Sequence, residues 1–173
     1  KKIDYNGQVW TYKYKPSGQV VEIKEYISGN PISKEIYTYT DDGNLLSKQR
    51  YENRIFSSTE EWEAHKANIP NLPHEGLFLK MKRMYHDNGN ETATLYNENS
   101  EIDYIINEVH DEKSRIVEFS ETHTSSKDLN YKHIRAWDEN DNFVEFKAYK
   151  GQKNTLTKVI KNEYDENNRI TKK

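Results

Sequence analysis

The sequence predicts an all-β protein, a twisted antiparallel meander of repeated β-hairpins that is open or gently coiled and carries one short inserted helix. Two observations support this fold class. A turn-forming motif recurs along the chain, and the segments between its copies alternate polar and apolar residues, which is typical of strands with one solvated face. Six copies of the motif begin with an aromatic residue or a histidine, at positions 14, 39, 85, 110, 137 and 164.

Each copy of the motif has the residues of a tight turn. A polar residue near its start can accept hydrogen bonds from the backbone ahead of it. Four places after the leading residue stands glycine, or a residue that replaces it in the left-handed conformation that closes a hairpin with a one-residue bulge. We expect the turns at Ser114 and, in a weaker copy, at Ser100 to be looser. The predicted turn positions are Gly18, Gly43, Gly89, Ser114, Asp141 and Asn168.

The spacing of the copies is regular except at one place. The intervals are 25, 46, 25, 27 and 27 residues. Because the long interval is close to two periods, we expect one copy to be replaced there by a helix and loop over residues 57–78. Ser58 and Glu61 have the spacing of a capping box, and Pro70 would end the helix. The whole chain, 1–173, then reads as a single β-repeat domain.

The strands between the turns are rich in tyrosine, whose ring packs while its hydroxyl stays near water. A second aromatic residue lies about halfway through several copies, so one strand and one turn take about 12 residues, which predicts ten to fourteen strands. The aromatic residues that could form a binding surface are Trp10, Tyr12, Tyr14, Tyr39, Tyr85, Trp137, Tyr149 and Tyr164.

The charge pattern argues against several classes of partner. The chain has 26 basic and 29 acidic residues, interleaved along its length, whereas a nucleic-acid binder needs a clustered positive surface. No apolar run approaches the length that spans a bilayer, so we expect no membrane-spanning segment. Cysteine is absent, which excludes disulfides and thiolate chemistry.

The motif resembles the YD repeats of the Rhs family of bacterial toxins and wall-associated proteins, and of the teneurins. Residues 137–143 and 164–170 are the closest copies, and the similarity covers most of the chain outside about 57–78. Shorter halves such as 26–30 look like MORN-type repeats, including those of bacterial proteins described as antitoxins. Both resemblances imply consecutive β-hairpins, and neither implies a particular chemistry.

No catalytic, cofactor or metal site is predicted. Glu61 and His65 are four residues apart on the expected helix, a spacing that surface pairs commonly share. The Asp-rich turns at 87–90 and 138–142 lack the distant bidentate glutamate of a calcium loop. No phosphate loop, nucleophile elbow or dinucleotide fingerprint occurs. We therefore expect a protein that is not an enzyme.

The leading hypothesis is a non-enzymatic binding or scaffold module that offers a Tyr-rich sheet surface to a protein partner, as an immunity, antitoxin-like or envelope protein would. Two alternatives stay open: a carbohydrate-binding module at the cell surface, and a structural fragment of a larger YD-repeat shell. The cell envelope or the extracellular space is slightly favoured over the cytoplasm.

Overall fold

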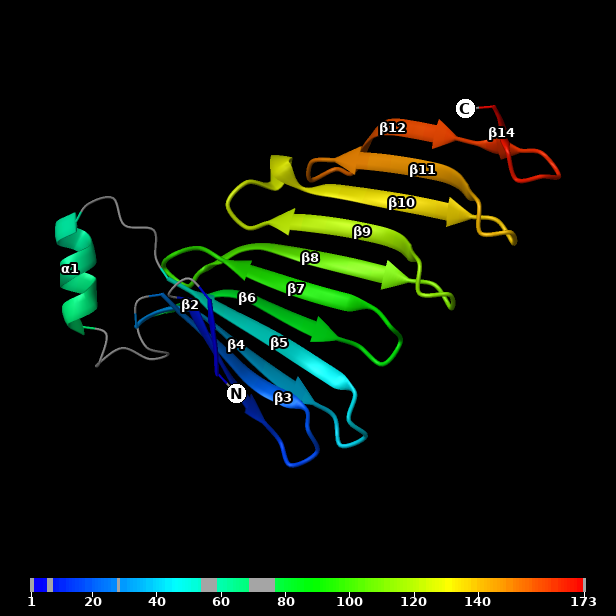
Figure 1. Ribbon diagram of the computed structural model, residues 1–173. Helices are drawn as coiled ribbons and strands as arrows, with labels where there is room; N and C mark the ends of the chain where they lie inside the picture. The colour runs from blue at the N-terminus through cyan, green and yellow to red at the C-terminus, as the bar shows by residue number, and fades with distance from the viewer. Residues whose placement is uncertain (1, 6–7, 28, 54–58, 69–76, 173) are drawn as a thin grey trace. The chain divides into compact units, whose positions relative to one another are not determined.

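The predicted all-β meander is confirmed by a computed structural model that describes residues 2–5, 8–27, 29–53, 59–68 and 77–172 (Figure 1). Its fourteen strands fall within the predicted range. They are β1 (Lys2–Tyr5), β2 (Gln8–Tyr14), β3 (Val20–Ile27), β4 (Asn30–Tyr39), β5 (Leu45–Glu52), β6 (Phe78–Tyr85), β7 (Glu91–Tyr96), β8 (Ile102–His110), β9 (Ile116–His123), β10 (Tyr131–Trp137), β11 (Phe143–Lys150), β12 (Thr155–Lys161), β13 (Glu163–Tyr164) and β14 (Ile170–Lys172).

Strands β1 to β12 are ordered as in the sequence, and β13 and β14 form a separate two-stranded pair. All the described pairings are antiparallel, from β1–β2 through β5–β6 and from β8–β9 through β11–β12. The chain divides into two compact units. The first unit comprises residues 1–84 and 95–101, and the second comprises residues 85–94 and 102–173.

The first unit holds most of the buried side chains. Tyr51, Ser47, Leu77 and Phe78 are between 6% and 9% exposed. Tyr51 and Ser47 are four residues apart on β5 and therefore lie on the same face of the strand. The small core of this unit gathers on that side of β5 and at the start of β6.

The second unit lacks a closed core in its main part. None of the side chains described between residues 102 and 172 is buried, and most of those on β8 to β11 are half-buried. Because a single sheet layer leaves both faces in reach of solvent, the aromatic residues of this unit remain partly exposed.

The recurring motif forms one type of turn. In each copy, the residue after the leading aromatic or histidine donates its N–H to the carbonyl four residues on, as from Lys15 to Gln19 at 2.8 Å. The residue four places after the leader also donates its N–H, to the carbonyl of the residue that directly follows the leader, as from Gly18 to Lys15 at 3.0 Å. Positive φ angles occur at Gly18 (87°), Gly43 (89°), Gly89 (81°), Ser114 (60°), Asp141 (65°) and Asn168 (58°).

The expectation of looser turns at Ser114 and Ser100 is wrong. Their turn hydrogen bonds measure 2.9–3.0 Å, the same as in the glycine turns at Gly43 and Gly89. The reason lies three residues earlier, where Asp111 and Asn97 each accept two backbone N–H groups with a single side-chain oxygen. These additional bonds hold the turn where the residue with positive φ is a serine.

The long interval between motif copies does not mark a replaced copy. β5 and β6 pair directly in register from Ser47 with Met84 to Glu52 with Phe78. The extra residues therefore lengthen a single connection between neighbouring strands. The connection includes a helix, α1 (Thr59–Asn68). Glu60 and Glu61 lie in its first turn, where negative carboxylates interact favourably with the helix dipole. The predicted cap Ser58, the stop Pro70 and the loop 71–76 lie outside the described residues.

Among the described residues, no helix combines the length and the hydropathy that crossing a bilayer requires.

Replacing Ser114 with glycine should raise the free energy of unfolding by about 1 kcal/mol, because glycine relieves the left-handed backbone conformation at φ 60°. Urea denaturation measures the change. Ser126→Gly is the matched control, since φ at Ser126 is −145°, and it should lower the stability by increasing the freedom of the unfolded chain. Equal effects of the two substitutions would contradict this account.

Candidate functional site

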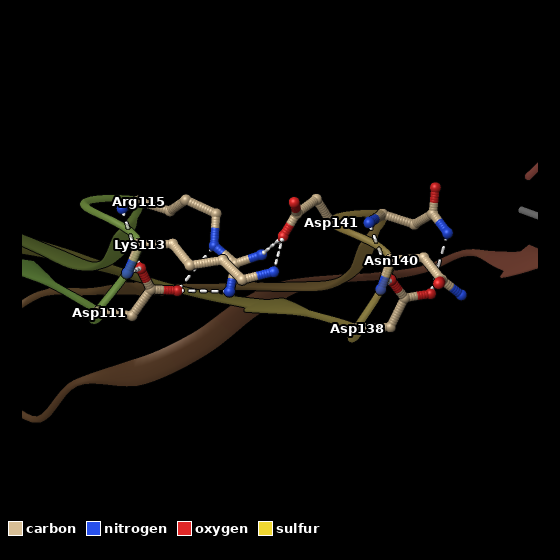
Figure 2. A network of polar contacts seen from close by, with 7 residues as sticks. Asp111, Lys113, Arg115, Asp138, Asn140 and Asp141 are labelled. Atoms are coloured by element: carbon tan, nitrogen blue, oxygen red, sulfur yellow. Dashed lines mark hydrogen bonds and ion pairs between the residues drawn. The ribbon is translucent and has the colours of Figure 1, made fainter.

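Successive turns at one edge of the second unit are joined by side chains, and we call this series the turn ladder (Figure 2). Arg115, which follows the left-handed residue of its turn, reaches the left-handed residue of the next turn, Asp141, at 2.5 Å. Lys113 also contacts Asp141, at 2.6 Å. Asn142 then donates to Asn168 in the following turn at 3.0 Å. The turns are thus connected from one hairpin to the next.

The first unit contains a step of the same kind. Gln19 follows the left-handed Gly18, and its side-chain amide donates to the carbonyl oxygen of Gly43, the left-handed residue of the next turn, at 2.8 Å. The recurrence of this contact in both units shows that the residue after the left-handed position has a structural role.

The leading tyrosines of two copies also hold the preceding hairpin. The hydroxyl of Tyr39 donates to the carbonyl of Val20 at 2.7 Å, and that of Tyr164 donates to the carbonyl of Phe143 at 2.9 Å. Val20 and Phe143 occupy the same place, directly after the preceding turn. These two tyrosines therefore stabilise the repeat, although their sequence pattern predicted a binding surface.

The aspartates of the second unit's turns are strongly hydrogen-bonded. Asp138 accepts the backbone N–H groups of Asn140 and Asn142 and the side-chain amide of Asn142, at 2.9–3.0 Å (Figure 2). The hydrogen bonds from Asn142 lower the pKa of Asp138. The side chain and backbone of Arg115 lower the pKa of Asp111, and the backbone N–H of Arg169 does so for Asp165.

One side of β8 to β11 carries a nearly continuous set of rings, which we call the aromatic face. Paired residues of neighbouring strands share a face, and Tyr104 pairs with His123, Phe119 with His133, and Arg135 with Phe146. Ring centroids of neighbours lie 5.0–6.5 Å apart. The face comprises Tyr104, Phe119, His123, Tyr131, His133, Trp137, Phe143 and Phe146.

Tyr131 and His123 of the aromatic face both contact the carboxylate of Glu121. Glu121 accepts the Tyr131 hydroxyl at 2.9 Å and contacts Nε2 of His123 at 2.6 Å. Burial, the hydrogen bond to Glu121 and the negative charge of Glu121 together raise the pKa of Tyr131 to about 12. The Tyr131 hydroxyl therefore stays protonated at neutral pH and acts as a donor that fixes the ring.

A hollow of about 400 Å³ opens at one end of the aromatic face. Its walls are Arg115, Ile116, Arg135, Trp137 and Phe143. The guanidinium of Arg115 lies 5.5 Å from the centroid of the Trp137 ring and is already bound to Asp111 and Asp141. Within the described part of the chain, the half-buried Arg135 has no hydrogen-bond or ion-pair partner, and the buried Nε1 of Trp137 has no acceptor.

The opposite side of the same strands differs in character. Lys132 pairs with Glu118 at 2.7 Å, and Glu145 pairs with Lys147 at 2.6 Å and with Lys161 at 3.5 Å. Hydrogen bonds from Lys147 and Lys161 lower the pKa of Glu145. The charges on this side are thus largely paired within the sheet. Of the predicted binding residues, Tyr149 lies on this side, because it pairs with Lys132.

In the first unit, Trp10, Tyr12 and Tyr14 alternate along β2 and share a face, and the rings of Tyr12 and Tyr14 stack at 6.3 Å. Glu35 lies on the same face, opposite Ile23, which pairs with Tyr12. Burial of Glu35 opposes its ionisation. Hydrogen bonds from Lys48 and Tyr37, together with the charges of Lys48 and Arg50, outweigh burial and lower the pKa of Glu35. This face is consequently more polar than the aromatic face.

The predicted binding residues are divided between the two units, and those of the second unit lie on both sides of its sheet. The structure places Trp137 on the aromatic face, Tyr149 behind it, Trp10, Tyr12 and Tyr14 in the other unit, and Tyr85 at the end of β6. The sequence pattern missed Phe119, Tyr131, His133 and Phe146, whose alternation on β9 to β11 was the available signal.

No family model and no curated protein matches the sequence. Several solved structures are weakly similar to the chain. A protein of unknown function from Bacteroides fragilis has 17% identity and a TM-score of 0.33, over 89% of this chain and 91% of its own. TcdB2-TccC3 without its hypervariable C-terminal region has 12% identity and a TM-score of 0.32, over 96% of this chain and 9% of its own.

A Tc holotoxin pore from Photorhabdus luminescens has 9% identity and a TM-score of 0.31, over 95% of this chain and 10% of its own. The chain thus spans about a tenth of these toxin chains. Since the TM-scores are near 0.3, we base the proposed function on the residues of this chain alone.

Tyr39→Phe should lower the free energy of unfolding by about 1 kcal/mol, because it removes the hydrogen bond to the Val20 carbonyl and keeps the ring. Tyr12→Phe is the matched control, since the Tyr12 hydroxyl has no partner among the described residues. Chemical denaturation of both variants measures the difference. A loss in Tyr12→Phe as large as that in Tyr39→Phe would show that the hydroxyl contact to Val20 is not the cause.

Lowering the pH should lower the free energy of unfolding of the second unit, because the turn aspartates become protonated. A carboxyl with a pKa below its ordinary value of 3.8 adds stability above that value and loses the stability as the pH falls through the lowered pKa. Asp138→Asn should flatten this dependence, because an amide oxygen can accept the same backbone bonds, as in the turn at Asn97. Urea denaturation between pH 7 and pH 3 measures the slope. Asp41→Asn, which removes a carboxylate without a described partner, should keep the wild-type slope.

Proposed function

We propose that the chain is a non-enzymatic β-repeat binding module, and that its partner is a protein segment that docks on the aromatic face of the second unit. The observation that supports the proposal best is the absence of buried side chains in the described residues 102–172, which leaves this row of rings partly exposed. Contiguous apolar surface of this kind is uncommon on a sheet that has no partner.

The two sides of the second unit favour the aromatic face as the docking side. Lysine and glutamate pairs cover the other side, and a partner would have to displace them or leave them hydrated. Aromatic side chains and arginine, by contrast, provide most of the binding free energy at protein interfaces. Both are present at the hollow beside Trp137 and Phe143.

The charges at the hollow indicate the chemistry of the partner. Arg135 lacks an acceptor, and burial together with the charge of Arg135 lowers the pKa of His133, so His133 is uncharged at neutral pH. The face thus presents one unpaired positive charge next to apolar rings. An acidic side chain beside an aromatic or aliphatic one on the partner would satisfy both features.

Selection from a displayed random-peptide library on the full chain tests the proposal. Peptides with Asp or Glu next to a large apolar residue should be enriched, and Arg135→Glu should weaken their binding at least about tenfold through charge repulsion. Since Arg135 has no intramolecular partner among the described residues, this variant should fold normally by circular dichroism.

Lys153→Glu is the charge-matched control, because Lys153 lies in the exposed turn between β11 and β12. It should bind the selected peptides as the wild type does. Equal loss in both variants would show a general effect of net charge. Selected peptides without acidic residues, or a signal on a glycan array in place of peptide binding, would also overturn the proposal.

A further inference from the structure

Two glutamates and a histidine of the second unit gather where β7 begins and β8 ends. One ligating atom from each of Glu91, Glu108 and His110 lies within 4.8 Å of the others. Glu108 and His110 are two residues apart on β8, so their side chains leave the same face of the strand. All three are half-buried. From this arrangement we infer a binding site for a divalent transition-metal ion of the zinc class.

The backbone aligns the three side chains. The side-chain oxygen of Asn90 accepts the backbone N–H of His110 at 3.0 Å, which fixes the start of β7 beside the end of β8. Glu91 directly follows Asn90 and is thereby held next to His110. The side-chain spacing therefore comes from ordered strands and a hydrogen-bonded turn, which reduces the conformational entropy lost when an ion binds.

An independent observation concerns the ring of His110. Its Nδ1 is shielded from solvent and has no hydrogen-bond partner within the described part of the chain. A shielded ring nitrogen without a partner is costly, and a bound cation would satisfy its lone pair. We assign Nδ1 as the ligand atom. Glu108 also has no hydrogen-bond or ion-pair partner among the described residues, so its charge is available to the ion.

The ligand set selects the kind of ion. Two carboxylates and one imidazole suit zinc and related transition metals, whereas calcium and magnesium favour sites made of oxygen ligands alone. A hollow of about 590 Å³, lined in part by Glu91 and Glu108, adjoins the cluster and leaves room for water as a fourth ligand. The sequence pattern predicted no metal site, and the separation of 17 residues from Glu91 to Glu108 is too large for a local ligand motif.

Calorimetric titration of the metal-free full chain with zinc chloride tests the site. One ion per chain should bind, and Glu91→Gln, Glu108→Gln and His110→Phe should each raise the Kd at least about tenfold. The amide and phenyl replacements keep the shape of the side chains, and circular dichroism verifies that the variants fold. Cobalt substitution gives a second readout, since a low-coordinate Co²⁺ site absorbs strongly in the visible range and the variants should lose the band.

Two matched variants distinguish this cluster from other histidines and carboxylates. His86 lines the same hollow but bonds to Thr92 at 3.0 Å, and Glu121 bonds to His123 at the other end of the unit. His86→Phe and Glu121→Gln should bind zinc as the wild type does. The inference is overturned if these two variants lose as much affinity as the cluster variants, if the wild type binds no zinc, or if calcium binds more tightly than zinc.

Discussion

The whole structure depends on a turn in which one residue adopts a left-handed backbone and a polar side chain accepts the N–H groups around it. The turn reverses the chain at each copy of the motif and sets the register of the two strands that it joins. In the turn at Ser114, where glycine is absent, Asp111 makes the difference, because its carboxylate bonds to the N–H groups of Lys113 and Arg115. Backbone conformation and side-chain hydrogen bonding thus act together, and a deficit in one is offset by the other.

Contacts between neighbouring hairpins then do part of what a closed core does in other domains. Arg115 and Asn142 connect successive turns at one edge of the second unit, and Tyr164 bonds to the strand of the hairpin before it. Each contact joins segments about one repeat apart. A sheet with no buried side chain in the described residues 102–172 relies on such local contacts, on strand pairing and on the stacking of half-buried rings.

The fold could be predicted from the sequence because turn chemistry is local. Gly18, Asp141 and Asn168 are recognisable by their place within the motif, and their backbone angles depend on few other residues. One expectation failed, and the candidate surface changed, for non-local reasons. The interval between positions 39 and 85 looked like two periods, but β5 pairs directly with β6, which only strand pairing could reveal. The candidate surface also differs from the predicted set, because Tyr39 and Tyr164 use their hydroxyls within the repeat and Tyr149 lies behind the aromatic face.

The insertion between β5 and β6 has a consequence for how such a chain can change over time. It extends a connection between two strands that remain paired, and the turn motif on either side of it keeps its usual hydrogen bonds. Connections of this kind can therefore accept new sequence without disturbing the hairpins around them. A lineage could acquire or lose helices and loops at these places while the sheet itself stays the same, so relatives of this chain would differ in length mainly between strands.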